Sequence, residues 1–321
     1  MHRGNKPVNQ RASFVICYRS MSLLTKSIEN LAQVTIVGVG LLGGSIGLAL
    51  KAAGYRGRVI GVGRRPQVVE RAIELKCIDA GCATLSEAVA MVEDKAAAQL
   101  VIICTPLSTF SALFAEFATC DRPGLIITDA GSTKEQVCKE AKAILPDASR
   151  FVGAHPMAGS ELHGPEHAKA DLFKGRLCIL TPQGTSSRAD AVELVRDLWQ
   201  ALGMKLTEKS PHDHDQIVAA ISHLPHAIAV LLVQLADEQK AISIAATGFR
   251  DTTRIASGDP RVWTDIFTSN KQAMLESLDH FSQSLARFRE VVSSGDEAEM
   301  LRLLSDVKQA RDTWLKQTWG E

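Results

Sequence analysis

The stretch VTIVGVGLLGG at residues 34–44 decides the fold of this chain. Its first four residues are β-branched, which predicts a buried parallel strand. Residues 45–53 have the apolar pattern of a helix, and Gly54 is a typical residue for ending one. Because strand, glycine-rich turn and helix follow without a gap, the pattern G-x-G-x-x-G predicts a dinucleotide site of the Rossmann type. The alternative is a glycine turn with a purely structural role.

The three glycines of this pattern have separate physical roles. Gly38 permits a tight turn, Gly40 lets a pyrophosphate approach the backbone, and Gly43 lets the helix pack closely on the strand. The phosphate charge would meet free N–H groups at the helix N-terminus. We therefore expect the dinucleotide to contact Gly38, Gly40, Leu41, Leu42 and Gly43.

The second predicted strand, residues 58–62, is followed by Gly63, Arg64 and Arg65. In dinucleotide-binding sheets an acidic residue at this place binds the adenosine ribose hydroxyls of NAD. Here no carboxylate is present to repel a 2′-phosphate, and two guanidinium groups are there to bind it. The sequence therefore favours NADP over NAD, with a solvated arginine pair as the alternative.

Three later apolar runs, at residues 100–104, 125–128 and 177–181, predict strands that alternate with helices. This alternation predicts a doubly wound α/β sheet. Ligands bind at the carboxyl ends of the strands in such sheets, so the residues after the first two runs are cofactor candidates. They are Thr105, Pro106 and Asp129.

Ser132 follows the second of these strands, at residues 125–128, and begins the sequence S-x-x-E. This pattern predicts a capping box closed by Glu135, at the start of a helix that runs to Leu145. Because a serine can cap a helix and still turn its hydroxyl to a ligand, Ser132 is also a site candidate.

The stretch FVGAHPMAGSE at residues 151–161 carries the residue best placed for chemistry. Its first four residues predict the end of a buried strand, and the proline, glycine and serine that follow cannot form a regular helix. His155 stands at the carboxyl edge of that strand. Because its ordinary pKa lies near ~6.5, a histidine can take or give a proton near neutrality. The alternative is a loop histidine that is merely hydrogen-bonded.

The second half of the chain, from about residue 187, has almost no strand signals. Apolar residues recur at steps of three and four from Trp263 to Phe288, which predicts one long amphipathic helix whose stripe is a core or a subunit interface. Residues 215–235 predict another helix, which Pro225 should kink. This helix carries His223 and His226, but no third ligand with matching spacing follows, so we predict no metal site.

Residues 248–256, GFRDTTRIA, are polar and charged between apolar helices. They form either a surface loop or a segment that returns to the crevice to hold a charged substrate. An arginine there could grip a carboxylate through two parallel hydrogen bonds.

Composition narrows the partners and the compartment. The chain has 321 residues, enough for two domains, and 36 basic residues balance 36 acidic ones. Zero net charge argues against nucleic acid or an anionic membrane as the main partner. No apolar run approaches the roughly 20 residues of a membrane span. Seven scattered cysteines without a C-x-x-C pair are typical of reduced thiols in a cytoplasmic protein.

The N-terminal residues 1–32 are basic up to Glu29 and are expected to form a flexible extension. Their only apolar patch is too short for the core of a signal peptide. A transit-like presequence and a true start at Met21 are the alternatives.

Several motifs together, in this order and at this approximate spacing, give the chain a family resemblance. They are GVGLLGGS, TDAGSTK, HPMAGSE followed by Asp171-Leu172-Phe173, SHLPH, and DTTRIA followed by Asp259-Pro260 and Trp263. The chain resembles the prephenate/arogenate dehydrogenase family of tyrosine biosynthesis. The resemblance implies an N-terminal Rossmann-type doubly wound sheet at residues 33–185, followed by an all-helical substrate and dimerisation domain at residues 186–321.

The reaction implied by the resemblance is the oxidative decarboxylation of prephenate or arogenate with a nicotinamide cofactor. Because Gly63-Arg64-Arg65 departs from the family's NAD-using pattern, we expect NADP to be preferred and NAD to be the second cofactor. His155 matches the catalytic histidine that accepts the hydroxyl proton, Ser132 the serine that orients it, and Arg254 the arginine that binds a substrate carboxylate. Further matches around the substrate pocket are Glu161, His226, Asp251 and Trp263. A homodimer and tyrosine as a candidate inhibitor are implied as well.

Two other classes of protein stay open from the residues alone. A β-hydroxyacid dehydrogenase also joins a Rossmann domain to helices, but its catalytic lysine lies on a helix of the second domain, and no such motif stands here. A non-catalytic NADP-binding sensor would need no histidine or arginine poised over the nicotinamide.

Overall fold

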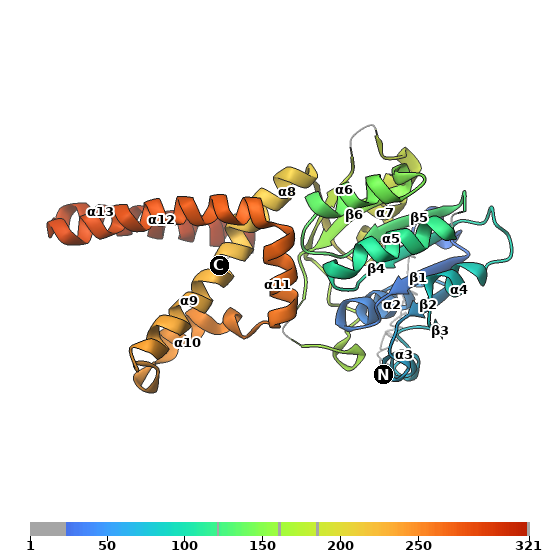
Figure 1. Ribbon diagram of the computed structural model, residues 1–321, viewed down its shortest axis with the longest axis horizontal. Coiled ribbons are helices and arrows are strands. Elements are labelled where there is room, and N and C mark those ends of the chain that lie inside the picture. The colour runs from blue at the N-terminus through green and yellow to red at the C-terminus, as the bar shows by residue number, and fades with distance from the viewer. Residues whose placement is uncertain (1–23, 121, 160–161, 184–185, 320–321) are drawn as a thin grey trace, which may run out of the picture.

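The N-terminal half of the molecule is built on one eight-stranded sheet (Figure 1). The structure, a computed structural model, describes residues 24–120, 122–159, 162–183 and 186–319. The strand order is β3-β2-β1-β4-β5-β6-β7-β8, and β7 runs antiparallel to β6. The order 3-2-1-4-5-6 is that of a Rossmann fold, so the predicted doubly wound α/β sheet is confirmed. The strands are β1 (Gln33–Val37), β2 (Arg58–Val62), β3 (Ala80–Cys82), β4 (Gln99–Ile103), β5 (Leu125–Asp129), β6 (Phe151–Pro156), β7 (Leu177–Thr181) and β8 (Lys205–Glu208).

The register brings the carboxyl ends of the central strands to one level. Val37 of β1 lies opposite Val62 of β2 and Ile103 of β4. Ile103 in turn lies opposite Asp129 of β5. The residues that follow these positions therefore share one edge of the sheet, and the chain reverses its winding direction there between β1 and β4. This edge is where open α/β sheets bind their ligands.

Each face of the sheet has its own apolar core. All residues of β1, β4 and β5 are buried, as expected for strands covered on both sides. One core lies under α1 (Lys26–Glu29), α2 (Leu41–Ala53), α3 (Pro66–Glu74) and α7 (Ala189–Ala201). The other lies under α4 (Leu85–Ala90), α5 (Phe110–Thr119) and α6 (Glu135–Ile144). The sheet is thereby a rigid support for the loops at its edge.

The sheet domain is longer at both ends than the sequence predicted. Ile28 of α1 and Leu31 are buried in the core, so the packed domain begins before residue 33. At the other end β8 pairs in parallel with β7, and the sheet runs to Glu208 rather than ending near residue 185. The strand KLTE at residues 205–208 is only partly buried and has one large apolar residue, so its pattern gave no signal.

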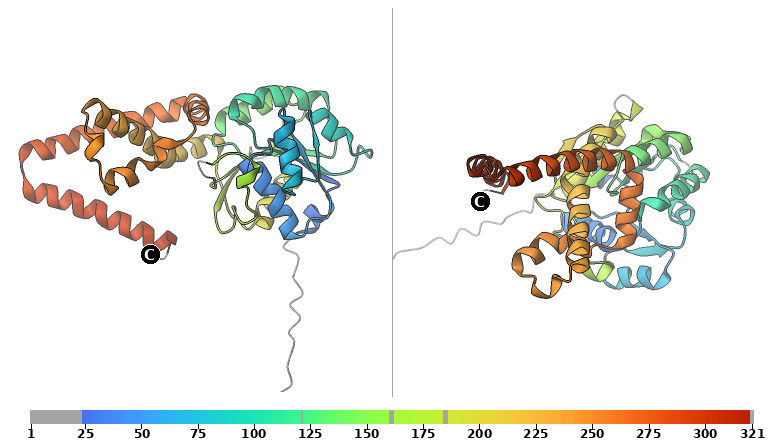
Figure 2. Two further views of the ribbon diagram at one scale, coloured as in Figure 1. Left: turned by 90° about the horizontal axis from the view of Figure 1, so that it is seen from below. Right: turned by 60° about the vertical axis from the view of Figure 1, so that its left-hand side comes forward.

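A second, all-helical part extends away from the sheet, as predicted (Figures 1 and 2). Figure 2 shows α12 and α13 as the two arms of a V that projects from the rest of the molecule. The helices are α8 (Pro211–Val218), α9 (Leu224–Glu238), α10 (Thr247–Thr253), α11 (Pro260–Ser269), α12 (Lys271–Ser294) and α13 (Glu297–Trp319). Shorter turns are η5 (Ala219–His223), η6 (Ile242–Ile244) and η7 (Arg254–Ser257).

Helices α8 and α9 continue into each other through η5, which is a π-helical turn. Pro225 is in the first turn of α9, directly after η5, and has no N–H to donate to the preceding turn. The disturbance predicted at Pro225 therefore takes the form of a widened turn. By length and a mean hydropathy of 1.8, Pro211–Glu238 could cross a membrane, although the sequence pattern predicted no such segment. Core helices pass the same test, and this helix makes polar contacts with the sheet domain that are described below.

The single helix predicted from Trp263 to Phe288 is two helices. Asn270 separates α11 from α12, with φ of −109° and ψ of 34°. Its buried side-chain amide donates to the backbone oxygen of Asp215 at 2.8 Å and to Nδ1 of His223 at 3.2 Å. The break is therefore stabilised by long-range contacts that a periodic pattern does not show.

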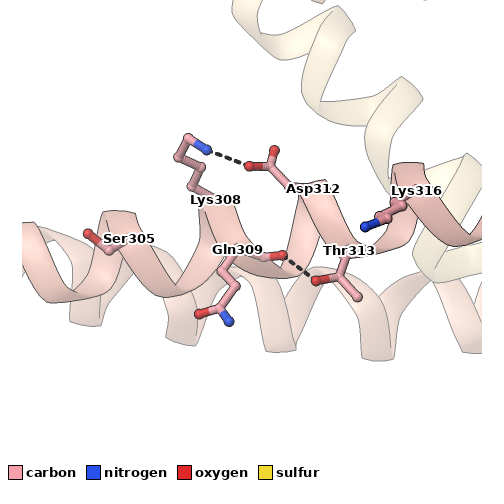
Figure 3. Close-up of a pocket in the computed structure, with 6 residues that line it drawn as sticks. All are labelled: Ser305, Lys308, Gln309, Asp312, Thr313 and Lys316. Carbon is pink, nitrogen blue, oxygen red and sulfur yellow. Dashed lines mark hydrogen bonds and ion pairs between the residues drawn. The ribbon is translucent and has the colours of Figure 1, made fainter. Parts of the chain in front are cut away.

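Helix α13 lies open to solvent. None of its described side chains is fully buried. Its polar residues line a surface hollow, in which Lys308 pairs with Asp312 and the Thr313 hydroxyl donates to the backbone oxygen of Gln309 at 2.8 Å (Figure 3). Because all six lining residues come from this one helix, the hollow is a solvated helix face rather than an enclosed ligand site.

Candidate active site

The glycine-rich turn between β1 and α2 has the shape of a dinucleotide loop. Gly38 has a φ of +95°, and a Cβ there would lie 2.8 Å from Cγ2 of Thr105, so only glycine fits. A Cβ on Gly43 would lie 2.1 Å from the backbone oxygen of Gly38, so α2 needs a glycine to pack this closely. At Gly40 a Cβ would meet no atom within 4 Å. A pyrophosphate fits this open space, in front of the N-terminus of a helix of 13 residues.

The other predicted cofactor residues lie at neighbouring strand ends on the same edge. Leu41 and Leu42, which begin α2, are half-buried. Arg64 and Arg65, which follow β2, are exposed to solvent. Thr105 and Pro106, which follow β4, lead into η1 (Leu107–Thr109).

Asp129 differs from these candidates because its side chain is completely buried. Its Oδ2 accepts from the backbone N–H of Gly131 at 2.8 Å and from the ammonium of Lys134 at 2.5 Å. Its Oδ1 accepts from the backbone N–H of Ala154 at 3.0 Å. Since protein groups contact both oxygens and the side chain is completely buried, the geometry gives the Asp129 carboxylate a structural task.

His155 lies at the end of β6, where this strand stops pairing with β5 and pairs with β7 instead. Its Nδ1 lies 2.9 Å from Nε2 of His214 on α8. Nδ1 of His214 lies 2.7 Å from Oδ1 of Asp215. The three side chains form a hydrogen-bonded chain that joins the sheet to the helical domain.

Asp215 is fixed in turn by the start of α6. Its Oδ1 accepts from the backbone N–H of Lys134 at 2.7 Å, and its Oδ2 from that of Glu135 at 2.9 Å. The capping box predicted for Ser132 and Glu135 is therefore wrong. A carboxylate 80 residues beyond Glu135 satisfies both N–H groups, and its charge is favourable at a helix N-terminus.

The partners in this chain determine which nitrogen atoms carry protons. Asp215 accepts from backbone N–H groups on both oxygens, so Nδ1 of His214 carries the proton between the two side chains. In a neutral His214, Nε2 is then the acceptor, and Nδ1 of His155 donates to it. The remaining nitrogen of His155, Nε2, keeps its lone pair. His155 therefore offers a hydrogen-bond acceptor to a ligand.

Burial keeps these histidines uncharged. It holds the pKa of His155 well below its usual range, and the neighbouring His214 and Lys134 lower that pKa further. Burial also lowers the pKa of His214, although Asp215 works in the opposite direction. The pKa of His223 falls to about 4, again mainly through burial. At neutral pH the acceptor nitrogen of His155 is therefore unprotonated and ready to take a proton.

An aromatic group continues the site into the helical domain. The rings of His226 and Trp263 stack with centroids 3.5 Å apart and 11° between their planes, and Phe267 lies beside both. A Cβ on Gly258 would lie 2.3 Å from Nε1 of Trp263, so this glycine allows the close approach. His226 is buried, and its Nδ1 has no hydrogen-bond partner among the described residues. Trp263 is half-buried, so it is the member of this stack that a ligand can reach.

Helix α11 meets the edge of the sheet at two places. Asp265 accepts from the backbone N–H and the hydroxyl of Ser108, at 3.1 and 2.6 Å. Ser269 lies 3.0 Å, hydroxyl to hydroxyl, from Thr133. Ser132, the neighbour of Thr133, is half-buried in the turn between β5 and α6. These contacts hold the helical domain over the edge that carries Ser132 and His155.

The remaining predicted substrate residues are less constrained. The segment 248–256 is neither an open loop nor a strand: α10 and η7 make it helical. Arg254 begins η7 and is exposed, and the exposed Asp251 pairs with its neighbour Arg250 at 3.1 Å. Glu161 lies outside the described residues.

Sequence reasoning missed His214, Asp215 and Lys134, and it gave Asp129 a cofactor role rather than the ion pair with Lys134. Their signal was present but weak, because His214 and Asp215 stand in the polar sequence PHDHD at the start of an apolar helix. Charged residues at such a place are usually solvated. Only the fold shows that they face the end of β6.

Two protein-family models match the chain. The model described as "Prephenate dehydrogenase, nucleotide-binding domain" matches residues 46–208. The model described as "Prephenate dehydrogenase, dimerization domain" matches residues 210–306. The boundary between them coincides with the end of β8 and the start of α8.

Curated relatives and solved structures point the same way. The chain is 35% identical over 285 residues to a prephenate dehydrogenase of Bacillus subtilis, covering 87% of the chain and 75% of the relative. It is 33% identical to a cyclohexadienyl dehydrogenase of Zymomonas mobilis, covering 87% and 94%. The prephenate dehydrogenase of Aquifex aeolicus in complex with hydroxyphenyl propionate and NAD+ has a TM-score of 0.82 at 32% identity, covering 88% and 98%. Synechocystis arogenate dehydrogenase has a TM-score of 0.74 at 30% identity, covering 88% and 99%.

Proposed function

The chain belongs to the prephenate dehydrogenase family, and from this premise we propose how its residues carry out the reaction. It is an oxidoreductase that oxidatively decarboxylates prephenate, arogenate or both in tyrosine biosynthesis. A bound NAD(P) supplies the hydride acceptor. The substrate ring gives up a hydride from C4 and the proton of its C4 hydroxyl, and the ring carboxylate leaves as CO2. The observation that carries the proposal is the acceptor nitrogen of His155, held at the edge of the sheet by His214 and Asp215.

His155 is the proposed base. Its Nε2 accepts the proton of the C4 hydroxyl as the hydride leaves, and returns it to the oxygen when loss of CO2 makes the ring aromatic. Asp215, acting through His214, stabilises the positive charge that His155 carries in between. The two partners also fix the ring orientation, so they are positioning residues rather than catalytic ones.

Other side chains are proposed to bind the substrate. Ser132 orients His155 and the substrate hydroxyl from the turn above β5. Arg254 holds a carboxylate, because an exposed guanidinium can form two parallel hydrogen bonds with one. His226 and Trp263 support the ring, as their stacked and partly apolar surface suggests. Glu161 and Asp251 complete the proposed pocket near the substrate side chain.

The cofactor is proposed to be NADP in preference to NAD. Arg64 and Arg65 are exposed after β2, where the 2′-position of the adenosine ribose is expected. Arg65 directly precedes the nine-residue helix α3, so a phosphate there would also meet the N-terminus of a helix. Neither residue has a carboxylate neighbour in the sequence GRRPQ that would repel a phosphate.

The quaternary state is proposed to be a cytoplasmic homodimer formed by the helical domain, with tyrosine as a candidate inhibitor. Large apolar side chains stay exposed along α9, α12 and α13, which is more than a lone soluble domain normally leaves uncovered. They include Leu231, Leu235, Leu285, Phe288, Leu304, Val307 and Trp314. Light scattering at micromolar concentration should give twice the chain mass of 34.7 kDa, and a monomer would contradict the proposal.

The test of the activity is spectroscopic. The protein is mixed with NADP or NAD and with prephenate or arogenate, and the absorbance of the reduced nicotinamide is followed. We expect it to grow with at least one substrate and faster with NADP. No growth in any of the four combinations would refute the proposed function. Addition of tyrosine to the active combination tests the inhibitor.

A further inference from the structure

Lys134 and Asp129 form an ion pair in which neither side chain is exposed to solvent. Burying two charges is costly, and such a pair often contributes little net stability compared with apolar residues of the same size. The pair lies directly behind the end of β6. Its surroundings suggest a task other than stability.

The carboxylate acts on the backbone that carries His155. Strands β5 and β6 pair only as far as Thr128 and Val152, after which β6 pairs with β7. The N–H of Ala154, the residue before His155, is therefore beyond the ladder with β5. Oδ1 of Asp129 accepts this N–H at 3.0 Å. The carboxylate thus fixes the strand at the point where it leaves its neighbour.

The lysine side chain also lies against β6. A Cβ on Gly153 would lie 3.1 Å from Cδ of Lys134, so the lysine stem runs along β6. Its ammonium also donates to the backbone oxygen of Thr133 at 2.9 Å. Its backbone N–H donates to Asp215, the last member of the chain that starts at His155. One residue therefore connects the strand end with the group that orients the histidine.

We propose that Lys134 and Asp129 are positioning residues for His155: the carboxylate fixes the backbone that carries the histidine, and the lysine places its ammonium group behind it. This proposal rests on the role of His155 as the base. The pair therefore fixes where the histidine stands, and its lysine adds to the effect of burial on how readily the histidine takes a proton.

The other titratable groups that face His155 do not supply such a charge. His214 on α8 and His223 in η5 are uncharged near neutrality because burial lowers the pKa of each. Burial raises the pKa of the Cys178 thiol on β7, so this group is also uncharged. Asp215 is negative, and Asp129 is paired. Among the described residues, Lys134 is therefore the charged group that adds to burial in lowering the pKa of His155, and so helps to keep the base free as the pH falls.

The experiment compares Lys134→Met, which removes the cation, with the double variant D129N/K134M, which removes both charges and keeps the shape of the pair. The control is Lys139→Met, which removes an exposed lysine from the same helix α6. Two quantities are measured against pH: kcat/KM, and the NMR signal of the His155 ring, identified by its loss in His155→Asn. The NMR titration needs no turnover, so it tests this proposal even if the proposed activity is not found.

We expect the pKa of His155 to rise by roughly one pH unit or more in Lys134→Met, since a nearby charge typically moves a pKa by about that amount. The double variant should show a smaller rise, because the buried Asp129 charge is gone as well. The acidic limb of the pH profile of kcat/KM should move to higher pH in both variants, and further in Lys134→Met than in the double variant. Lys139→Met should match the wild type. Lys134→Met leaves a buried carboxylate unpaired. If this variant does not fold, the pKa of His155 in the double variant is the measurement that tests the proposal. A His155 pKa in the double variant equal to that of the wild type, with only a lower melting temperature, would overturn the proposal.

Discussion

The glycine-rich turn after β1 and the histidine group around His155 lie on one edge of the sheet but are assembled differently. The turn is made by consecutive residues, and its essential groups are backbone atoms and the missing side chain of Gly40. The histidine group combines His155 from β6 with His214 and Asp215 from α8, 59 or more residues further along the chain. Local spacing is enough for the first, whereas the second exists only when two domains are packed together.

The glycine-rich turn is the proposed cofactor-binding site, and the histidine group is the proposed site of proton transfer. A site made of backbone tolerates change in its surroundings, because the glycine conformations are set locally. A site made of long-range side-chain contacts depends on each partner, because one missing acceptor changes the proton position of the next ring. We therefore expect mutations on the two sides to affect different kinetic constants.

The largest expected effect is that of His155→Asn. Because the variant lacks the base, kcat should fall about 10²–10⁴-fold, while the dissociation constant of NADP should stay nearly unchanged. Stopped-flow turnover and a fluorescence titration of the cofactor measure the two quantities. His212→Asn, at an exposed position of α8, serves as the control. A kcat within about threefold of the wild type would remove His155 from the mechanism.

The next effect is that of His214→Phe, which keeps an aromatic ring of similar shape and removes both nitrogen atoms. His155 then has no acceptor for its Nδ1 proton, so kcat should fall by about 10–10²-fold, less than with loss of the base. His212→Phe changes an exposed histidine two residues earlier and should leave kcat unchanged. If His214→Phe kept wild-type turnover, the hydrogen-bonded chain would have no part in orienting His155.

Arg254→Gln should act mainly on substrate binding. Loss of a carboxylate clamp should raise KM about tenfold or more and lower kcat much less, because the contact exists in both ground and transition states. The matched control is Arg261→Gln, an exposed arginine in the first turn of α11 that has no proposed role in the pocket. An unchanged KM in Arg254→Gln, or an equal rise in the control, would contradict the assignment.

The smallest expected effect is on the cofactor side. Arg64→Ala and Arg65→Ala should each lower kcat/KM for NADP by about 5–20-fold, since each removes one charged hydrogen-bond donor from the 2′-phosphate. The value for NAD is the internal control and should stay the same. Equal losses for both cofactors would show that the arginines do not distinguish them.

The contrast between the two sides also explains how far the sequence could predict the structure. The sheet, the glycine turn and the helix ending at Gly54 follow from local patterns, and the structure has them where predicted. The helix from Trp263 to Phe288 was predicted as one because Asn270 fits its periodicity, whereas the contacts of Asn270 with Asp215 and His223 break it. The local sequence likewise predicted that Ser132 caps the helix that follows it, whereas Asp215 accepts from the N–H groups at the start of α6.

The chain from His155 to Asp215 could not be predicted, because no spacing rule links residues that meet only through domain packing. The family resemblance identified His155 and Arg254 but said nothing of their supports. Those supports are long-range polar contacts. They form because buried polar groups need hydrogen-bond partners, and this burial exists only in the folded molecule.

The π-helical turn η5 sets the helical phase of everything that follows it. It lies between His214 on α8 and His226 on α9. A single π-helical turn inserted in an α-helix adds about one residue to that turn. One residue corresponds to a rotation of about 100° around the helix axis. With a regular α-helix in place of η5, His226 would therefore point about 100° away from its present direction and lose its stack on Trp263, while His214 would still reach His155. The extra residue is what allows one helix to present a positioning histidine to the sheet and a second histidine to α11.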